Sequence, residues 1–195
     1  MLILAAVAAT TLGLSGCAAS TPASTPAHSQ VQTQASGDML ADHGLAGLDA
    51  PEIIEQLDTL PIAERPTNLI ASVQPGALVL TDDQQRETQL EMPANQVYIS
   101  VAPYQNQTHD CYYHSLTTCV GELGNEDVQV TLTGSDGEVL IDETRQTYDN
   151  GFVGMWVPRG IEAELTVTLG ESTGSAPIST VNSDDPTCIT TLQLS

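Results

Sequence analysis

The sequence predicts an α+β fold, with a small N-terminal helical lobe followed by an antiparallel, β-sandwich-like domain. Two changes in the pattern of apolar residues carry this prediction. Between residues 50 and 60 they recur with the period of a helix, and beyond Pro75 they alternate with the period of a strand. The length of 195 residues suits one ordinary domain with a small appendage.

Residues 1–17 predict an export signal that ends in a lipidation site. The apolar run carries no charged side chain and stops at Leu14-Ser15-Gly16-Cys17. A run this short is typical of a secretory signal rather than a membrane span. Leu-Ser-Gly-Cys resembles the lipobox of bacterial lipoproteins, whose cysteine is lipidated. We therefore expect an exported protein that is lipid-anchored through Cys17 on the extracytoplasmic (periplasmic or outer) face of a membrane.

Residues 18–37 predict a disordered tether between this anchor and the folded part. Ser, Thr, Ala, Pro and Gln dominate the segment, and no acidic or basic residue other than His28 occurs before Asp38. Such a composition buries too little apolar surface to offset the conformational entropy of the chain. The tether is expected to hold the folded part away from the membrane.

Residues 38–75 predict the helical lobe. The segment Asp49-Ala50-Pro51-Glu52 has the pattern of a helix start, with a capping side chain, an early proline and an acidic first turn. The apolar residues that follow share one helical face: Ile53, Ile54, Leu57 and Leu60. A second short helix is expected from Thr67 to about Ser72. So small a lobe lacks an independent core, and we expect it to pack on the rest of the chain or on a second copy in a homodimer.

Residues 76–195 predict the β-rich domain. A polar turn between two short apolar segments predicts a hairpin of 78–80 and 88–92. Alternating segments separated by turn residues predict further strands at 96–102, 128–132, 138–142, 151–157, 161–169 and 189–194. Residues 170–174 are expected to form a polar loop. Short strands with regular turns favour an antiparallel sandwich, and residues 128–169 resemble the transthyretin-like, carboxypeptidase-regulatory type.

The chain is strongly acidic. It has 25 acidic residues against four arginines and no lysine, and its net charge is -21. This charge repels phosphate backbones and anionic lipid headgroups, which argues against nucleic-acid binding and against electrostatic docking to a membrane. Membrane contact is therefore expected through the lipid anchor only.

Three cysteines remain once Cys17 is assigned to lipidation: Cys111, Cys119 and Cys188. In an exported chain an odd number cannot all pair internally, so at least one thiol is left for a metal, redox chemistry or a partner. Two of the three lie in residues 109–119, which also contain two histidines and two tyrosines. The segment follows a predicted strand, and we expect a loop or a single helical turn.

Thiolates beside an imidazole form a ligand set that selects Cu(I) or Zn(II). Cys111 and His114 would share one face of a helical turn, and pairing of the last strand beside this loop would bring in Cys188. Three thiolates suit trigonal Cu(I), whereas Zn(II) needs a fourth ligand, for which His114 is the candidate. The alternative is equally open from spacing: Cys111 and Cys119 form a disulfide that staples the loop, and Cys188 is a buried small hydrophobic residue.

Two motifs resemble the CueP family of periplasmic copper-binding proteins. They are Cys-Tyr-Tyr-His-Ser-Leu-x-Thr-Cys at 111–119 and Thr-Cys-Ile-Thr-Thr-Leu-Gln-Leu at 187–194, and residues 57–66 and 71–75 fit the N-terminal part of the family. The resemblance implies copper binding through three cysteines, which correspond here to Cys111, Cys119 and Cys188. It also implies copper resistance, in which the protein buffers copper, passes it to a partner or reduces Cu(II) to Cu(I).

Three functions follow, ranked in this order. The first is a copper-binding protein of copper resistance and homeostasis that holds Cu(I) on the three thiolates, with a copper donor or acceptor protein as partner. The second is a thiol-disulfide redox protein or Cu(II) reductase that uses the same cysteines, so the sequence leaves open whether the protein is an enzyme. The third is a structural sandwich domain stapled by a disulfide.

Overall fold

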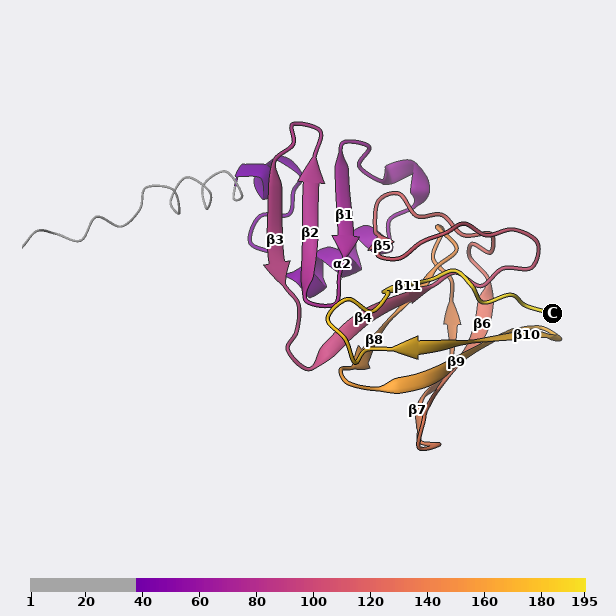
Figure 1. The fold of residues 1–195 in the computed structure, drawn as a ribbon. Helices are drawn as coiled ribbons and strands as arrows, with labels where there is room; N and C mark the ends of the chain where they lie inside the picture. Colours follow the sequence, from indigo (N-terminus) through magenta and orange to yellow (C-terminus); the bar gives the residue numbers. More distant parts are fainter. Residues whose placement is uncertain (1–37) are drawn as a thin grey trace, which may run out of the picture.

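Three β-sheets and a short N-terminal helical region form the part of the chain described in the computed structural model, residues 38–195 (Figure 1). The α+β, sandwich-like fold predicted from the sequence is confirmed. The predicted export signal, the lipidation site Cys17 and the tether 18–37 lie outside the described residues. Within residues 38–195, no helix is long and apolar enough to cross a membrane.

The predicted amphipathic helix is α2, Ala50–Asp58. Asp49 and Glu52 form a reciprocal capping box at its start, in which each side chain accepts a hydrogen bond from the backbone N–H of the other. The short 3-10 helix η1 follows at Ile62–Glu64. The second helix predicted from Thr67 is wrong, because this segment forms strand β1, Leu69–Val73. Its residues are buried alternately, a period of two that is hard to distinguish from a helical turn over five residues.

The N-terminal sheet has the order β3-β2-β1-β5, and all its neighbouring strands are antiparallel. Its strands are β1, β2 (Ala77–Asp82), β3 (Glu87–Glu91) and β5 (His114–Ser115). The hairpin predicted in this region is β2 and β3. The apolar face of α2 and this sheet share one hydrophobic core, so the helical region is packed on the strands that follow it.

The sandwich consists of two further sheets, with orders β10-β9-β6-β7 and β11-β4-β8. Their strands are β4 (Gln96–Val101), β6 (Asp127–Gly134), β7 (Val139–Gln146), β8 (Val153–Pro158), β9 (Glu162–Leu169), β10 (Ser172–Ser179) and β11 (Cys188–Ile189). Every pairing is antiparallel except that of β11 with β4, which is parallel. The polar loop predicted at 170–174 is wrong for most of its length, because β10 begins at Ser172. The regular strand predicted at 189–194 is limited to β11.

Strand β4 connects the two hydrophobic cores. Val97, Ile99 and Val101 face the core of the sandwich, whereas Tyr98 contributes to the core beneath α2. A third, small cluster contains Ala102, Phe152 and Cys188, with two further cysteines packed against it. The cysteines therefore lie where the N-terminal sheet meets the sandwich.

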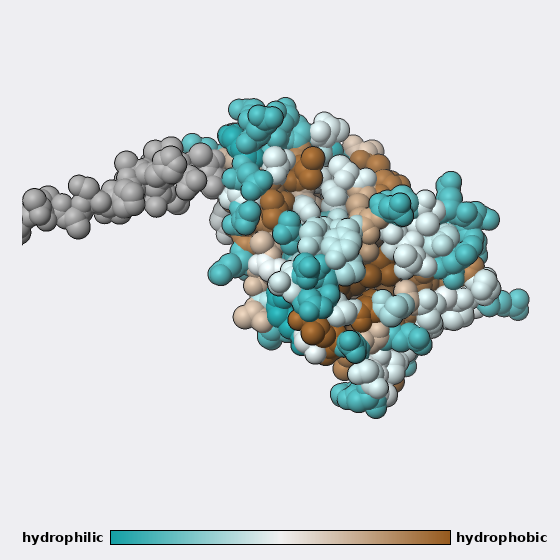
Figure 2. Space-filling model, viewed as in Figure 1, coloured by the Kyte–Doolittle hydropathy of each residue, from teal (hydrophilic) through white to brown (hydrophobic). Residues whose placement is uncertain are grey.

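The surface agrees with the acidic composition. On the face drawn in Figure 2, hydrophilic residues cover the outer edges, and apolar residues reach the surface between them. Large apolar side chains exposed near the cysteine-rich segment are Tyr112 and Val120.

Candidate metal centre

The cysteine-rich segment 109–119 is an irregular loop that contains the two-residue strand β5 and not the helical turn considered from the sequence. β5 pairs with β1, which places His114 opposite Val73. The hydroxyl of Thr187 donates a hydrogen bond to the carbonyl of Val73 (2.6 Å) and accepts one from the backbone N–H of His114 (3.1 Å). The buried Thr187 therefore joins the start of β11 to both β1 and the loop.

Backbone hydrogen bonds bring the last cysteine beside the first. The N–H groups of Thr187 and Cys188 both donate to the carbonyl oxygen of Tyr112, at 3.0 and 3.1 Å. Cys188 and Cys111 are joined by a disulfide, with Cα atoms 5.7 Å apart. The pairing of Cys111 with Cys119 considered from the sequence is therefore wrong. The prediction failed because the parallel pairing of β11 with β4 places Cys188 beside the loop. The spacing of cysteines within the loop gives no information about this pairing.

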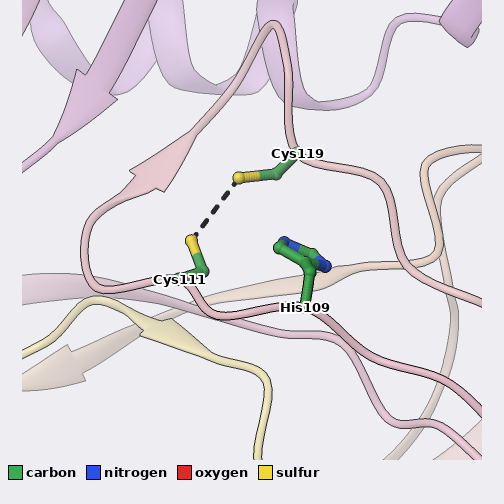
Figure 3. Close-up of side chains that lie close together, drawn as sticks. All are labelled: His109, Cys111 and Cys119. Atoms are coloured by element: carbon green, nitrogen blue, oxygen red, sulfur yellow. Dashed lines mark hydrogen bonds between the residues drawn. The ribbon is translucent and has the colours of Figure 1, made fainter.

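The third sulfur lies next to this disulfide. Cys119 is the free cysteine of the described residues, and its Sγ lies 3.5 Å from Sγ of Cys111. Figure 3 shows these two sulfurs pointing toward one another, with the ring of His109 beside them. All three sulfurs thus belong to one cluster. The distance between the Cys119 sulfur and the disulfide is short enough for thiol-disulfide exchange.

Two overlapping groups of side chains have a geometry that can hold a metal ion. One consists of His114, Cys119 and Cys188, and the other of His109, Cys111 and Cys119. Within each group, the candidate ligand atoms lie within 4.8 Å of one another. Cys119 belongs to both groups, so it is the sulfur on which the two arrangements depend.

A buried polar network centred on Asp58 holds the ring of His114 in place. Its Nε2 lies 2.9 Å from Oδ1 of Asp58, and neither side chain is exposed to solvent. Asp58 also accepts hydrogen bonds from the hydroxyl of Tyr98 (2.8 Å) and from Nδ2 of Asn150 (3.0 Å). The other ring nitrogen, Nδ1, lies 4.0 Å from Sγ of Cys188.

The network shifts both partners toward their charged forms. Burial lowers the pKa of His114, but the charge and hydrogen bond of Asp58 outweigh it and raise that pKa to about 9. Burial raises the pKa of Asp58, yet the charge of His114 and the hydrogen bonds from His114, Tyr98 and Asn150 hold it below its ordinary value. The site therefore contains a buried imidazolium-carboxylate pair beside the sulfurs.

The Cys119 thiol lies in an electropositive environment. Its Sγ accepts a hydrogen bond from the backbone N–H of Ser115 at 3.4 Å, and Nη1 of Arg65 donates to its carbonyl oxygen at 2.7 Å. Burial raises the pKa of Cys119, but the hydrogen bond and charge of His114, with smaller contributions from Ser115 and Arg65, lower it below its ordinary value. These contacts favour the thiolate form of Cys119, which is the form that binds soft metals and attacks disulfides.

A pocket of about 450 Å³ leads from solvent to this thiol. His109 and Cys119 both contribute to its lining. Glu122 fixes one wall, because its carboxylate accepts hydrogen bonds from the backbone N–H groups of Gln105 (2.7 Å) and Asn106 (2.9 Å). The hydrogen bonds from Asn106 and its neighbours lower the pKa of Glu122 to about 2.

Two glycines allow the cysteine loop to approach the turn before β8. The N–H of Gly121 donates to the carbonyl of Asn150 at 2.6 Å. Gly151 has a φ of +77°, and a Cβ at this position would lie 2.7 Å from the carbonyl carbon of Gly121. This contact places Cys119 against the segment that supplies Asn150 and Phe152.

The structure places the four candidate ligands predicted from the sequence in one region: Cys111, His114, Cys119 and Cys188. From sequence alone His109 could be either a solvent-facing residue or an entry ligand for Cu(II); in the structure its ring lines the pocket and its Nε2 is buried. Sequence reasoning missed Asp58, Arg65 and Asn150. Asp58 did carry a signal, because it follows Ile54 by four residues and so places a lone carboxylate on the apolar face of α2.

This arrangement of soft sulfur ligands and imidazoles on a β-sandwich defines a thiol-rich metal-binding protein. A sequence model of the family described as "Periplasmic copper-binding protein CueP" matches residues 52–193, and the chain belongs to the CueP family. Membership of this family indicates that the protein binds copper and is located outside the cytoplasm.

A solved structure supports the same assignment. The protein described as "Crystal Structure of S.CueP" is 37% identical to this chain, with a TM-score of 0.76. The match covers 82% of this chain and 97% of that one. Among curated proteins, none matches the chain.

Proposed function

We propose that this protein binds Cu(I) in copper resistance and homeostasis, using the thiolates of Cys111, Cys119 and Cys188. The observation that carries the proposal is the clustering of the three sulfurs, with one pair bonded and Cys119 at 3.5 Å from Cys111. Reduction of the disulfide frees three soft donors, which suit Cu(I). His114 is a further ligand through Nδ1, because this atom faces Cys188.

Zinc is the alternative metal. A tetrahedral Zn(II) site requires four ligands, and the three thiolates with His114 would supply them. Two considerations favour copper: the family to which the chain belongs and the sufficiency of three thiolates for Cu(I).

The disulfide supports a second candidate function, the reduction of Cu(II). Two thiolates supply one electron to each of two Cu(II) ions, which gives two Cu(I) ions and one disulfide. Cys111 and Cys188 are the pair that becomes oxidised, and Cys119 with His114 retains one Cu(I) while the other leaves for an acceptor. Continued turnover requires an external thiol reductant to reopen the disulfide. In this form the protein is a thiol-disulfide redox protein or Cu(II) reductase.

Copper reaches the sulfurs through the pocket beside Cys119. His109 lines this pocket and is grouped with Cys111 and Cys119. Because imidazole suits Cu(II) better than thioether or carbonyl donors do, His109 is the first ligand of an arriving Cu(II) ion. The ion then meets the thiolate of Cys119.

The cellular setting follows from the N-terminal sequence. Lipidation of Cys17 anchors the protein to the membrane on its extracytoplasmic face, and residues 18–37 serve as the tether. The β-rich domain, residues 76–195, carries the copper site. A donor or acceptor protein exchanges copper with it. The apolar face of the lobe formed by residues 38–75 packs on the N-terminal sheet, so the lobe does not require a homodimer to cover it.

Competition with a Cu(I) chelator tests the binding function, using the same protein with the disulfide reduced and with it intact. Tight 1:1 binding by the reduced form and much weaker binding by the oxidised form is expected. Equal affinity of the two forms would contradict a three-thiolate site, and no binding by either form would favour a structural sandwich domain. Cu(II) added with a thiol reductant separates the second function, because a reductase gives steady turnover faster than the reductant alone and a binding protein gives one stoichiometric burst above that rate.

A further inference from the structure

We propose that Asp58 is a positioning residue, which holds the ring of His114 by Nε2 so that Nδ1 faces the sulfurs as the metal-binding atom. The inference rests on the proposed function, because it takes His114 as a ligand. Asp58 is the last residue of α2, and His114 is the first residue of β5. The N-terminal helix therefore orients a ligand in the cysteine-rich loop.

The hydrogen-bond pattern fixes which ring nitrogen of His114 keeps its proton when a metal binds. The carboxylate of Asp58 accepts from Tyr98 at 2.8 Å and from Asn150 at 3.0 Å, and both partners can act there as donors. A carboxylate in this position has no proton to donate to His114. Nε2 of His114, 2.9 Å from Oδ1, must therefore be the donor. In the imidazolium Nδ1 carries a proton as well, and this is the proton that a metal displaces, because Nε2–H stays bonded to Asp58.

The ring is also held sterically. His114 is completely buried, and its ring packs on Phe152 with centroids 4.5 Å apart. In this position Nδ1 lies 4.0 Å from Sγ of Cys188, and His114 belongs to the group that includes Cys119. A flip of the ring about the Cβ–Cγ bond would exchange Nδ1 with Cδ2 and Nε2 with Cε1, so it would break the bond to Asp58 and turn Nδ1 away from Cys188.

The carboxylate is itself held in place. Tyr98 and Asn150 approach it from β4 and from the turn before β8, and a guanidinium nitrogen of Arg65 lies 4.0 Å from Oδ1. Metal-binding histidines commonly donate their second N–H to a carboxylate, which fixes the ring and increases its basicity as a ligand. Asp58 occupies that place here with all its partners buried.

The first test uses the protein without any substitution. In ¹⁵N-histidine-labelled protein, we expect the NMR signals of His114 in the Cu(I) complex to show a proton on Nε2 that exchanges slowly with water, and a metal-shifted Nδ1. A proton on Nδ1 with the metal on Nε2 would overturn the proposal. This measurement remains decisive if a substitution of Asp58 prevents folding.

The second test compares Asp58→Asn with Asp82→Asn, measuring Cu(I) affinity by chelator competition and thermal unfolding of each variant. Asp58→Asn preserves the shape of the side chain but removes the charge that fixes Nε2–H, and we expect Cu(I) binding to weaken by about 10- to 100-fold. Asp82→Asn makes the same change in a buried carboxylate at the end of β2, which pairs with Arg86 and is not hydrogen-bonded to His114, and we expect Cu(I) affinity to change by less than about threefold.

The outcomes of the second test separate the two claims. If the reduced, unsubstituted protein fails to bind Cu(I), the proposed function is wrong. If it binds and Asp58→Asn binds equally well, the copper site stands and the positioning role of Asp58 is overturned. Equal losses in Asp58→Asn and Asp82→Asn would also overturn it, because they would reflect a general effect of removing a buried charge.

Discussion

Asp58 and His114, which are 56 positions apart in the sequence, share a hydrogen bond of 2.9 Å between two side chains that are fully buried. One residue ends α2 and the other begins β5, so the bond joins the N-terminal helical region to the cysteine-rich loop. The candidate metal centre is therefore a product of both parts of the fold and does not belong to the loop alone.

This buried pair predicts a loss of stability at alkaline pH. The pKa of His114 is raised from an ordinary 6.5 to about 9 in the folded protein. Its contribution to the free energy of unfolding is fully present below pH 6.5 and is lost as the pH rises toward 9. Thermal unfolding of the disulfide-intact Cys119→Ser protein, which removes the titration of the thiol, is expected to show a midpoint that falls across this range.

The matched control for the pH experiment is His114→Gln in the same Cys119→Ser background. Without the imidazole, the midpoint is expected to change much less between pH 6.5 and 9. Parallel curves for the two proteins would show that the ion pair with Asp58 adds no stability in this window.

The environment of Cys119 predicts a reactive thiol. With the Cys111–Cys188 disulfide intact, alkylation of the chain from Ser20 onward is expected to follow an apparent pKa below the ordinary cysteine value. His114→Gln is expected to raise this pKa, and Arg65→Gln to raise it by less, because His114 contributes more than Arg65. Alkylation rates measured against pH by mass spectrometry test the order, and an equal or reversed order would contradict it.

Gly151 predicts a steric requirement beside the site. Its φ of +77° and its contact with Gly121 both exclude a side chain. Gly151→Ala is expected to lower the free energy of unfolding by about 2–4 kcal/mol, the sum of the backbone penalty and overpacking. Gly137→Ala is the control, because Gly137 has a φ of +86° with open space around it, and we expect a loss of about 1–2 kcal/mol.

Chemical denaturation of the two alanine variants measures this difference. Similar losses would mean that the approach of Gly151 to Gly121 is not required for packing. A larger loss at Gly151, with slower alkylation of Cys119, is the expected result, because this contact positions the loop.

Local sequence patterns predicted much of the fold. The capping signals at Asp49 and Glu52 located α2, and alternation of apolar residues located most strands of the sandwich. The strand at Leu69–Val73 was mistaken for a helix because five residues hold too few periods to separate the two patterns. β10 was missed because its Ser, Thr and Gly residues give little apolar alternation.

The candidate site could be predicted only in part, because its ligands and their supports come from distant segments. The composition of residues 109–119 indicated soft metal ligands, and the odd cysteine count indicated a free thiol. The disulfide partner of Cys111 depends on the parallel pairing of β11 with β4, which no local pattern encodes. The support of His114 by Asp58 depends on how α2 packs, and its signal was a single carboxylate on an apolar face.

The most direct test of the three-thiolate site is a Cu(I) titration against a competing chelator. It uses the reduced, anaerobic chain from Ser20 onward and the single variants Cys111→Ser, Cys119→Ser and Cys188→Ser. We predict a tight 1:1 complex that each of the three substitutions weakens by at least about tenfold, the lower end of what the loss of even a supporting residue costs a metal site. No binding, or affinity unchanged in Cys188→Ser, would contradict the account.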